Sequence, residues 1–177
     1  MTDKALPLEI SKRSLRLSPI GTIRTPFREP TGTPIQPSRA ASAPGQIHLH
    51  EEYREALKDL AGFERIWLIY WLHKAIGPKL QVIPFLDTVE RGVFATRSPA
   101  RPNPIGLSAV RLVRVEGLII DVEGVDIVDG TPLLDIKPYV SEFDSFGKQR
   151  AGWFDGAAVR RDMADDRFDI ERQAETE

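Results

Sequence analysis

The sequence contains no cysteine among its 177 residues. Disulfide bridges, a thiol nucleophile and cysteine-ligated zinc or iron–sulfur sites are therefore excluded. The chain also has no long apolar run, because the longest, Ile66–Leu72, is far shorter than the roughly 20 residues that span a bilayer. The N-terminus lacks the apolar segment of a signal peptide. We therefore expect a protein without a membrane anchor that resides in the cytoplasm, where thiols stay reduced.

The sequence also has few features of nucleic-acid binding by overall charge, of metal binding or of serine hydrolase chemistry. The formal net charge is only −2, so any contact with nucleic acid must come from a local basic patch. Three histidines are present, and His48, His50 and His73 do not have the spacing of a known zinc motif, so we expect no metal site. No serine lies in a glycine-flanked nucleophile motif, which argues against serine hydrolase chemistry.

The stretch Arg91–Leu112 is the most unusual part of the chain, because a stiff loop interrupts two predicted strands. Its prolines are Pro99, Pro102 and Pro104. Each proline fixes its own φ and restricts the residue before it. Arg97, Arg101 and Asn103 can therefore be held in place before a ligand arrives, which lowers the entropic cost of binding. The alternative is a rigid corner with solvated arginines.

The residues after this loop are candidates for backbone contacts. Gly106 has no side chain, so we expect a ligand to approach the backbone closely there. The amides of Leu107 and Ser108 would then face that ligand.

The first half of the chain predicts several elements. Residues 1–14 are expected to be a flexible tail, and 15–23 an opening strand. The proline-rich residues 26–44 are either a linker or an ordered binding loop. Residues 51–63 have the apolar spacing and ends of an amphipathic α-helix. The apolar residues 64–73 indicate a strand buried on both faces.

The second half predicts mostly strands, over residues 80–85, 92–96, 107–115, 118–127 and 133–140. About seven strands and one helix, with turns at short intervals, favour a β-barrel or sandwich. Asp126 falls in an apolar strand, where a buried carboxylate needs a partner such as a ligand amine or a loop arginine. Residues 141–177 are polar. Their expected anchors are Phe143, Phe146, Trp153 and Phe154.

Several motifs together resemble one family. ATRSPARPNPIGLS, preceded by GVF and followed by DGTPLLDIKPY, is similar to the TsaA-like, or TrmO-like, β-barrel S-adenosylmethionine-dependent methyltransferases. The opening PIGTIRTPF, the QP step of the proline-rich loop and GFERIWLIYWLH match as well. The resemblance covers Pro19–Tyr139. It implies a mainly β fold, a small closed or partly open antiparallel barrel with one main α-helix and long loops. We place the barrel domain at 15–140 and a C-terminal extension at 141–177.

The resemblance also implies a cofactor, S-adenosyl-L-methionine, bound near the interface of a homodimer, and tRNA as the substrate. The implied cofactor-binding residues are Gln36, Pro37, His73, Lys74, Arg97, Leu107, Gly124, Val125 and Asp126. Lys74 departs from the family, which often has His-Gln at this step. Arg101, Asn103 and Tyr139 are the expected substrate contacts. A phosphate-binding rim would comprise Arg24, Arg28, Arg39 and Arg101. No residue is assigned as a catalytic base.

Relatives in this family methylate the exocyclic amine of threonylcarbamoyl-adenosine beside the tRNA anticodon, which is the function that the resemblance implies here. Larger relatives carry a further C-terminal domain, for which the residues after Val140 are too few. Two alternatives therefore stay open. One is a non-catalytic barrel that binds S-adenosylmethionine, and the other is a methyltransferase for a small molecule.

Overall fold

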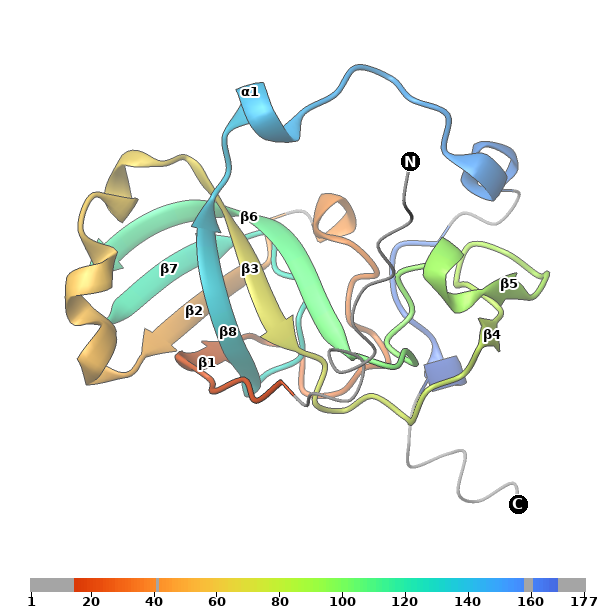
Figure 1. The fold of residues 1–177 in the computed structure, drawn as a ribbon, viewed down its shortest axis with the longest axis horizontal. Helices are drawn as coiled ribbons and strands as arrows, with labels where there is room; N and C mark the ends of the chain where they lie inside the picture. Colours follow the sequence, from red (N-terminus) through yellow and green to blue (C-terminus); the bar gives the residue numbers. More distant parts are fainter. Residues whose placement is uncertain (1–14, 41, 158–160, 169–177) are drawn as a thin grey trace, which may run out of the picture.

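The computed structural model describes residues 15–40, 42–157 and 161–168. Its centre is a closed barrel of six antiparallel strands in the order β1-β2-β7-β6-β3-β8, in which β8 pairs again with β1. The strands are β1 Gly21–Arg24, β2 Pro44–Leu49, β3 Arg65–Trp71, β6 Ile105–Glu116, β7 Ile119–Glu123 and β8 Thr131–Pro138. The expected mainly β fold and antiparallel barrel are confirmed (Figure 1).

The barrel interior is filled by alternate residues of each strand, as the two-residue period of a strand requires. In β3, Ile66, Leu68 and Tyr70 point into the core, while Trp67 and Ile69 on the other face are only partly buried. The prediction that this strand is buried on both faces is therefore wrong. A closed sheet has an inside and an outside, and only the inside is fully covered.

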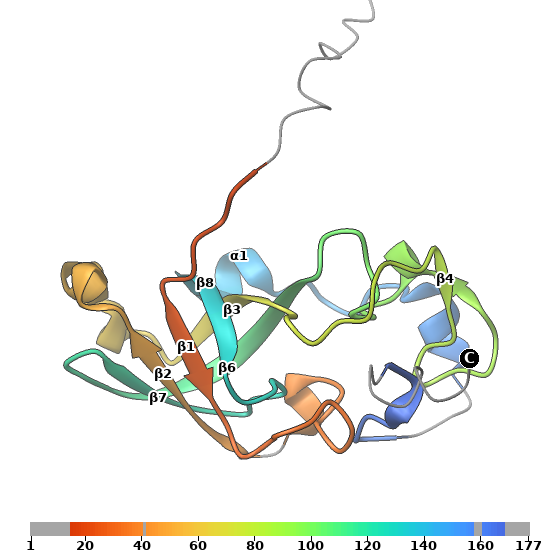
Figure 2. The same ribbon diagram turned by 90° about the horizontal axis from the view of Figure 1, so that it is seen from below.

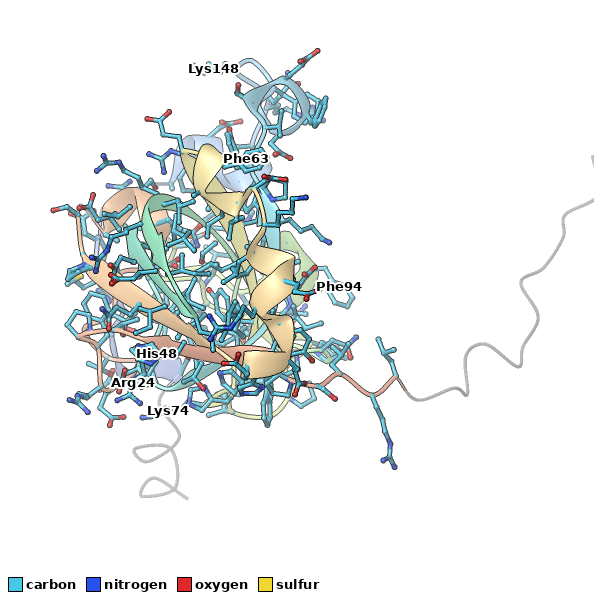
Figure 3. The ribbon with its side chains drawn as sticks, turned by 90° about the vertical axis from the view of Figure 1, so that its left-hand side faces the viewer. Arg24, His48, Phe63, Lys74, Phe94 and Lys148 are labelled. Carbon is cyan, nitrogen blue, oxygen red and sulfur yellow. The ribbon has the colours of Figure 1, made fainter. Side chains whose placement is uncertain are left out.

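The expected α-helix over 51–63 is also wrong. The segment forms two 3-10 helices, η3 Glu51–Leu57 and η4 Leu60–Gly62, which are separated by Asp59 at φ 66°. Leu57, Leu60 and Phe63, three residues apart, pack against the core. A spacing of three matches the three residues per turn of a 3-10 helix. These turns cover one end of the barrel (Figure 3).

Other boundaries differ from the expectation. The opening strand begins only at Gly21, and β7 stops at Glu123, before Gly124 at φ 80°. The segments expected as strands over 80–85 and 92–96 contribute only β4 Gln81–Val82 and β5 Arg91–Gly92, which form a separate two-stranded sheet. The 3-10 helix η5 Val93–Ala95 follows β5.

The two ends of the barrel differ. Figures 1 and 2 show the loops, with β4 and β5, at one end of the barrel and η3 at the other. Among the residues that the structure describes, no helix is long and apolar enough to cross a membrane. The expected flexible tail at 1–14 lies outside the described residues.

The C-terminal extension returns to the loop-rich end. It contains α1 Ser141–Asp144, η6 Gly152–Gly156 and η7 Asp166–Phe168. Phe143 and Phe146 are 69% and 79% exposed, so neither is the expected anchor. Phe168 is buried instead, with its ring 5.2 Å from that of Phe85 in an edge-on contact. Trp153 makes a lesser contact, since its indole N–H donates to Ala95 O at 2.8 Å.

Candidate functional site

A cavity of about 490 Å³ lies at the loop-rich end of the barrel. Its walls come from the end of β3, the start of β6, the β7–β8 connection and three loops or segments, 30–36, 96–103 and 164–168. Cavities of 300–1,000 Å³ with apolar walls and a few polar groups are typical of small-molecule sites. The proline-rich stretch is thus an ordered wall of the cavity for residues 30–36, as the binding-loop alternative requires.

The C-terminal segment is joined to that wall by backbone hydrogen bonds. Gly32 N donates to Ala164 O at 2.9 Å, and Ala164 N donates to Thr33 O at 2.8 Å. Arg39 pairs with Asp162 at 2.8 Å. The segment 161–168 therefore closes one side of the cavity, a role that its polar sequence did not indicate.

The stiff loop is held by its own polar groups. Arg101 donates to the carbonyl oxygens of Thr96 and Ser98, both at 3.3 Å, and Ala100 N donates to the buried Ser98 Oγ. Arg101 thus supports the loop, although it also lines the cavity. Asn103 lines the cavity and is exposed.

Two predicted cofactor-binding residues meet across the cavity mouth. The guanidinium of Arg97 donates a hydrogen bond to Gln36 Oε1, although the two residues lie far apart in the sequence. Both line the cavity. Among the residues that the structure describes, no carboxylate forms an ion pair with Arg97, so its positive charge can serve an anionic ligand group.

A chain of three polar side chains runs from the buried Tyr70 and Ser108 to the partly buried Asp126. Tyr70 Oη lies 2.9 Å from Ser108 Oγ, and Ser108 Oγ donates to Asp126 Oδ1 at 2.6 Å. Tyr70 and Ser108 are 5% and 1% exposed. Burial raises the pKa of Asp126 to about 6, against the hydrogen bond from Ser108 and the nearby charge of Arg97. Burial likewise raises the pKa of Tyr70, followed by the charge of Asp126.

Asp126 is in the β7–β8 connection rather than in a strand, which corrects the expectation. The predicted need for a partner is met by Ser108, whereas no loop arginine hydrogen-bonds to it in the part of the chain that the structure describes.

The structure gives a different reason for a glycine at position 106 from the close ligand approach expected there. A Cβ built on it would lie 2.1 Å from Cε2 of Tyr70, the residue opposite it on β3. The glycine therefore makes room for the tyrosine ring, although its backbone also borders the cavity.

His73 lies where β3 ends and lines the cavity. Burial, then the charge of Lys74, lowers its pKa, so the ring is neutral at pH 7. The hydroxyl of Thr131 donates to Val128 O at 2.7 Å and lies 3.4 Å from His73 Nδ1.

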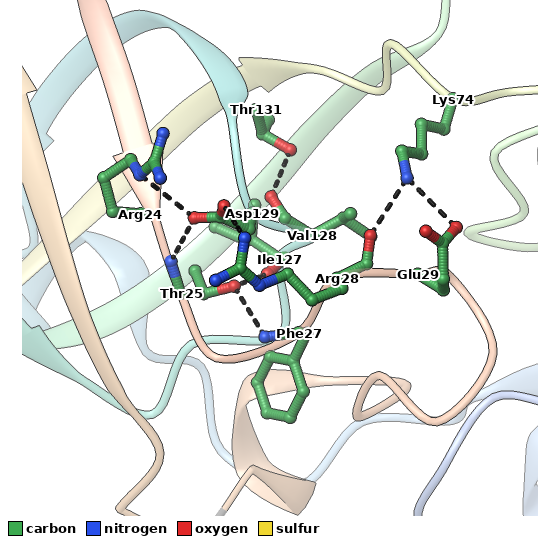
Figure 4. Close-up of polar contacts among 10 residues, drawn as sticks. All are labelled: Arg24, Thr25, Phe27, Arg28, Glu29, Lys74, Ile127, Val128, Asp129 and Thr131. Atoms are coloured by element: carbon green, nitrogen blue, oxygen red, sulfur yellow. Dashed lines mark hydrogen bonds and ion pairs between the residues drawn. The ribbon is translucent and has the colours of Figure 1, made fainter.

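Lys74 also lines the cavity, but its ammonium group contacts protein. Nζ donates to Arg28 O at 2.9 Å and to Glu29 at 3.0 Å, as Figure 4 shows. Asp129 holds the same loop, because it accepts from Thr25 N at 3.0 Å and pairs with Arg24 at 3.2 Å.

Three arginines of the expected phosphate-binding rim form ion pairs within the protein. Arg24 and Arg28 pair with Asp129, and Arg39 pairs with Asp162. These pairs tie loops together, and they leave Arg97 better placed than the rim to receive an anion.

A second groove of about 580 Å³ runs over the outer face of β3 and β6 and is continuous with the cavity through shared residues. The shared residues are Gln36, Trp67, Arg97 and Leu107. Pro37, Gly124 and Tyr139 line the groove but not the cavity. Val125 lines neither space, because its side chain is fully buried in the core.

The cavity and the groove together are lined by every predicted cofactor-binding and substrate-binding residue except Val125. Sequence reasoning missed Tyr70, Thr131 and Phe168, which read as ordinary core or tail residues. No three His, Asp or Glu side chains within the described ranges gather closely enough to hold a metal ion.

The fold and the site define a small closed β-barrel with a ligand cavity at one end, where a carboxylate, a guanidinium and an imidazole converge. The family model for the tRNA-methyltransferase O N-terminal domain matches residues 22–145, and the chain belongs to this family. The resemblance seen in the sequence is confirmed.

Individual relatives agree. The chain is 48% identical over 161 residues to a probable S-adenosyl-L-methionine-binding protein of Pyrococcus abyssi. The aligned region covers 91% of this chain and 85% of that protein. It is 33% identical over 170 residues to the tRNA (adenine(37)-N6)-methyltransferase of Escherichia coli, covering 90% and 72%. The crystal structure of TrmO from Pseudomonas aeruginosa matches with a TM-score of 0.70 and 38% identity, covering 84% of this chain and 66% of that one.

Proposed function

We propose that the chain is an S-adenosyl-L-methionine-dependent methyltransferase that methylates the N6 position of threonylcarbamoyl-adenosine beside the tRNA anticodon. The observation that carries this proposal is the cavity itself, which places Arg97, Asp126 and apolar walls together in a chain of this family. The family relatives named as methyltransferases and S-adenosyl-L-methionine-binding proteins support the same reaction and cofactor.

The residues present fit this cofactor. Its amino-acid end carries both charges, for which Arg97 and Asp126 are complementary, and its adenine suits apolar walls such as Leu107 and Ile127. His73 and Gln36 offer polar contacts at the same cavity. Lys74 contributes by fixing the loop at Arg28 and Glu29.

The cofactor would supply a methyl group on a sulfonium centre, whose carbon–sulfur bond breaks to release a neutral thioether as a good leaving group. The protein's own residues therefore act mainly by positioning. The stiff loop holds Arg97 with Gln36, the C-terminal segment 161–168 covers one side, and burial keeps His73 neutral. Asn103, Arg101 and Tyr139 face the spaces from which a nucleotide would enter.

The test is single-turnover methyl transfer to bulk tRNA with an isotopically labelled donor, read by nucleoside mass spectrometry. We expect label on threonylcarbamoyl-adenosine. Arg97→Ala should lower the rate by about tenfold or more, as loss of a charge-assisted contact does. Arg114→Ala is the matched control, because Arg114 pairs with Glu116 and Asp121 away from both spaces and should leave the rate unchanged.

The outcomes separate the alternatives. Donor binding without label on any nucleoside would contradict the proposal and favour a non-catalytic S-adenosylmethionine-binding barrel. Label on a small molecule of a cell extract, and none on tRNA, would favour a small-molecule methyltransferase.

The assembly that we propose is a homodimer formed over the outer face of β3 and β6. Trp71, Ile105 and Leu107 on this face are 48%, 42% and 55% exposed, and the groove beside them joins the cavity. A partner there would cover the cavity mouth. Sedimentation equilibrium should give a dimer for the wild type and a monomer for Ala109→Arg, and a monomeric wild type would contradict the assembly. We also propose a cytoplasmic location, which a tRNA substrate would support.

A further inference from the structure

The chain Tyr70–Ser108–Asp126 needs an explanation that packing does not give. Three polar side chains lie at the edge of a core that otherwise consists of aliphatic residues. Burying a carboxylate is costly, and its raised pKa reflects that cost. An apolar residue at each position would remove the cost, so the arrangement is expected to serve the cavity that Asp126 lines.

The hydrogen bonds of this chain have a fixed direction. Ionised Asp126 only accepts, so the hydroxyl proton of Ser108 points to Oδ1, at 2.6 Å. Ser108 Oγ must then accept from Tyr70, whose hydroxyl lies 2.9 Å away. Reversing the direction would turn the Tyr70 proton toward a buried, apolar surrounding without an acceptor.

In the described part of the chain, one carboxylate oxygen therefore accepts from a side chain and the other does not. Oδ1 is bound by Ser108, whereas among the residues that the structure describes no side chain donates to Oδ2. Since Asp126 lines the cavity, a ligand donor can complete its hydrogen bonding. Arg97 lines the same cavity and would receive the opposite charge.

We propose that Tyr70 and Ser108 are positioning residues, which orient the Asp126 carboxylate so that it accepts a hydrogen bond from an N–H group of the bound ligand. This proposal rests on the proposed function. The N–H group belongs either to the ammonium of the methyl donor or to the amine of the methyl acceptor. Gly106 is part of the arrangement, because it admits the Tyr70 ring that reaches Ser108.

Charged and titratable groups around Asp126 enter any pH dependence. Tyr70 on β3 and Arg97 in the stiff loop act on it directly. The others that line the cavity are His73, Lys74, Arg101 and Asp165. None of these last four residues is changed by the variants below, so a difference between variants reports on Tyr70, Ser108 and Asp126 themselves.

The first measurement is the pKa of Asp126 by carboxyl carbon NMR in the ligand-free protein. The Ser108 hydrogen bond favours the ionised form, so Ser108→Ala should raise this pKa by about one unit. Tyr70→Phe keeps the ring and should raise it less. Val110→Ala is the matched control, because Val110 is the next inward residue of β6 and its fully buried aliphatic side chain cannot hydrogen-bond. It should lower stability and leave the pKa unchanged.

The second measurement is the affinity for S-adenosylhomocysteine, which keeps the ammonium, between about pH 5 and pH 8, together with single-turnover transfer. If the N–H belongs to the donor, Ser108→Ala weakens this affinity by about fivefold near pH 6 and less at pH 8, because the ionised carboxylate is lost at a higher pH. If it belongs to the acceptor, affinity is unchanged and the transfer rate falls with the same pH pattern.

Asp126→Asn sharpens the test. Its amide cannot turn its oxygen to the ligand without leaving the Ser108 proton unpaired, so binding or transfer should fall by about tenfold to one-hundredfold at pH 8. An unchanged Asp126 pKa in Ser108→Ala, or an equal loss at every pH, overturns the proposal. Failure of the proposed function looks different, because the wild type itself then shows neither binding nor transfer.

Discussion

Replacing Gly106 with alanine should damage both the barrel and its cavity through one side chain. The added Cβ would lie 2.1 Å from Cε2 and 2.4 Å from Cζ of Tyr70, against the 3.4–4 Å of ordinary contact. The pair cannot slide apart, because β3 and β6 are joined by a continuous register from Arg65↔Arg111 to Trp71↔Ile105. The ring must therefore leave its place, and its hydroxyl must leave Ser108.

The size of the effect follows from these two losses. Overpacking a core costs about 1–3 kcal/mol, and a lost buried hydrogen bond about 1 kcal/mol more. We expect the free energy of unfolding to fall by roughly 2–4 kcal/mol. For a chain of this size that corresponds to a melting temperature lower by roughly 5–15 °C. Affinity for the methyl donor should fall as well, since Asp126 loses its support.

A double-mutant cycle measured by urea unfolding isolates the cause. Tyr70→Val removes the ring, so Gly106→Ala in that background should be neutral or stabilising by up to about 1 kcal/mol, because strand backbone suits alanine. The coupling free energy should reach at least about 2 kcal/mol. An equal cost of Gly106→Ala in both backgrounds would refute the account of this glycine.

Three further predictions concern the cavity walls. Asp126→Asn should stabilise the fold at pH 8, because the raised pKa of Asp126 means that its ionised carboxylate is the less stable form in the folded protein. The gain in stability should vanish as the pH falls through about 6 toward 4, which urea unfolding at a series of pH values measures. Phe168→Ala should lower donor affinity several-fold in calorimetry while the barrel still unfolds cooperatively, whereas Phe146→Ala, at an exposed ring, should change neither. Asp129→Ala should cost about 1–3 kcal/mol of stability by leaving Thr25 N unpaired. A cost equal to that of Glu116→Ala, which removes an exposed ion pair with Arg114, would contradict this.

The sequence was most informative where the backbone is constrained. Three prolines within six residues leave little conformational choice, so Arg97, Arg101 and Asn103 could be predicted to border one site. All three line the cavity. The alternation in 107–115 likewise predicted β6, the strand that carries Leu107 and Ser108. Exposed rings such as Phe94, which points away from the molecule in Figure 3, were beyond this reasoning because nothing local distinguishes them from anchors.

Long-range partners could not be predicted. Tyr70 is one apolar-looking residue in RIWLIYW, and only the register with β6 shows that its hydroxyl meets Ser108 and that Gly106 makes room for it. The segment 161–168 is polar, and its place beside loop 30–36 depends on backbone hydrogen bonds that no side-chain pattern encodes. The 3-10 turns at 51–63 were mistaken for an α-helix because periods of 3.0 and 3.6 coincide over so few residues.

The most direct test of the central claim, that the cavity at the loop-rich end of the barrel is the methyl-donor site, is a calorimetric titration with S-adenosyl-L-methionine. The account predicts saturable binding to the wild type, strongly weakened binding to Arg97→Ala and unchanged binding to Arg114→Ala. Equal affinities for all three proteins, or no binding to the wild type, would contradict it.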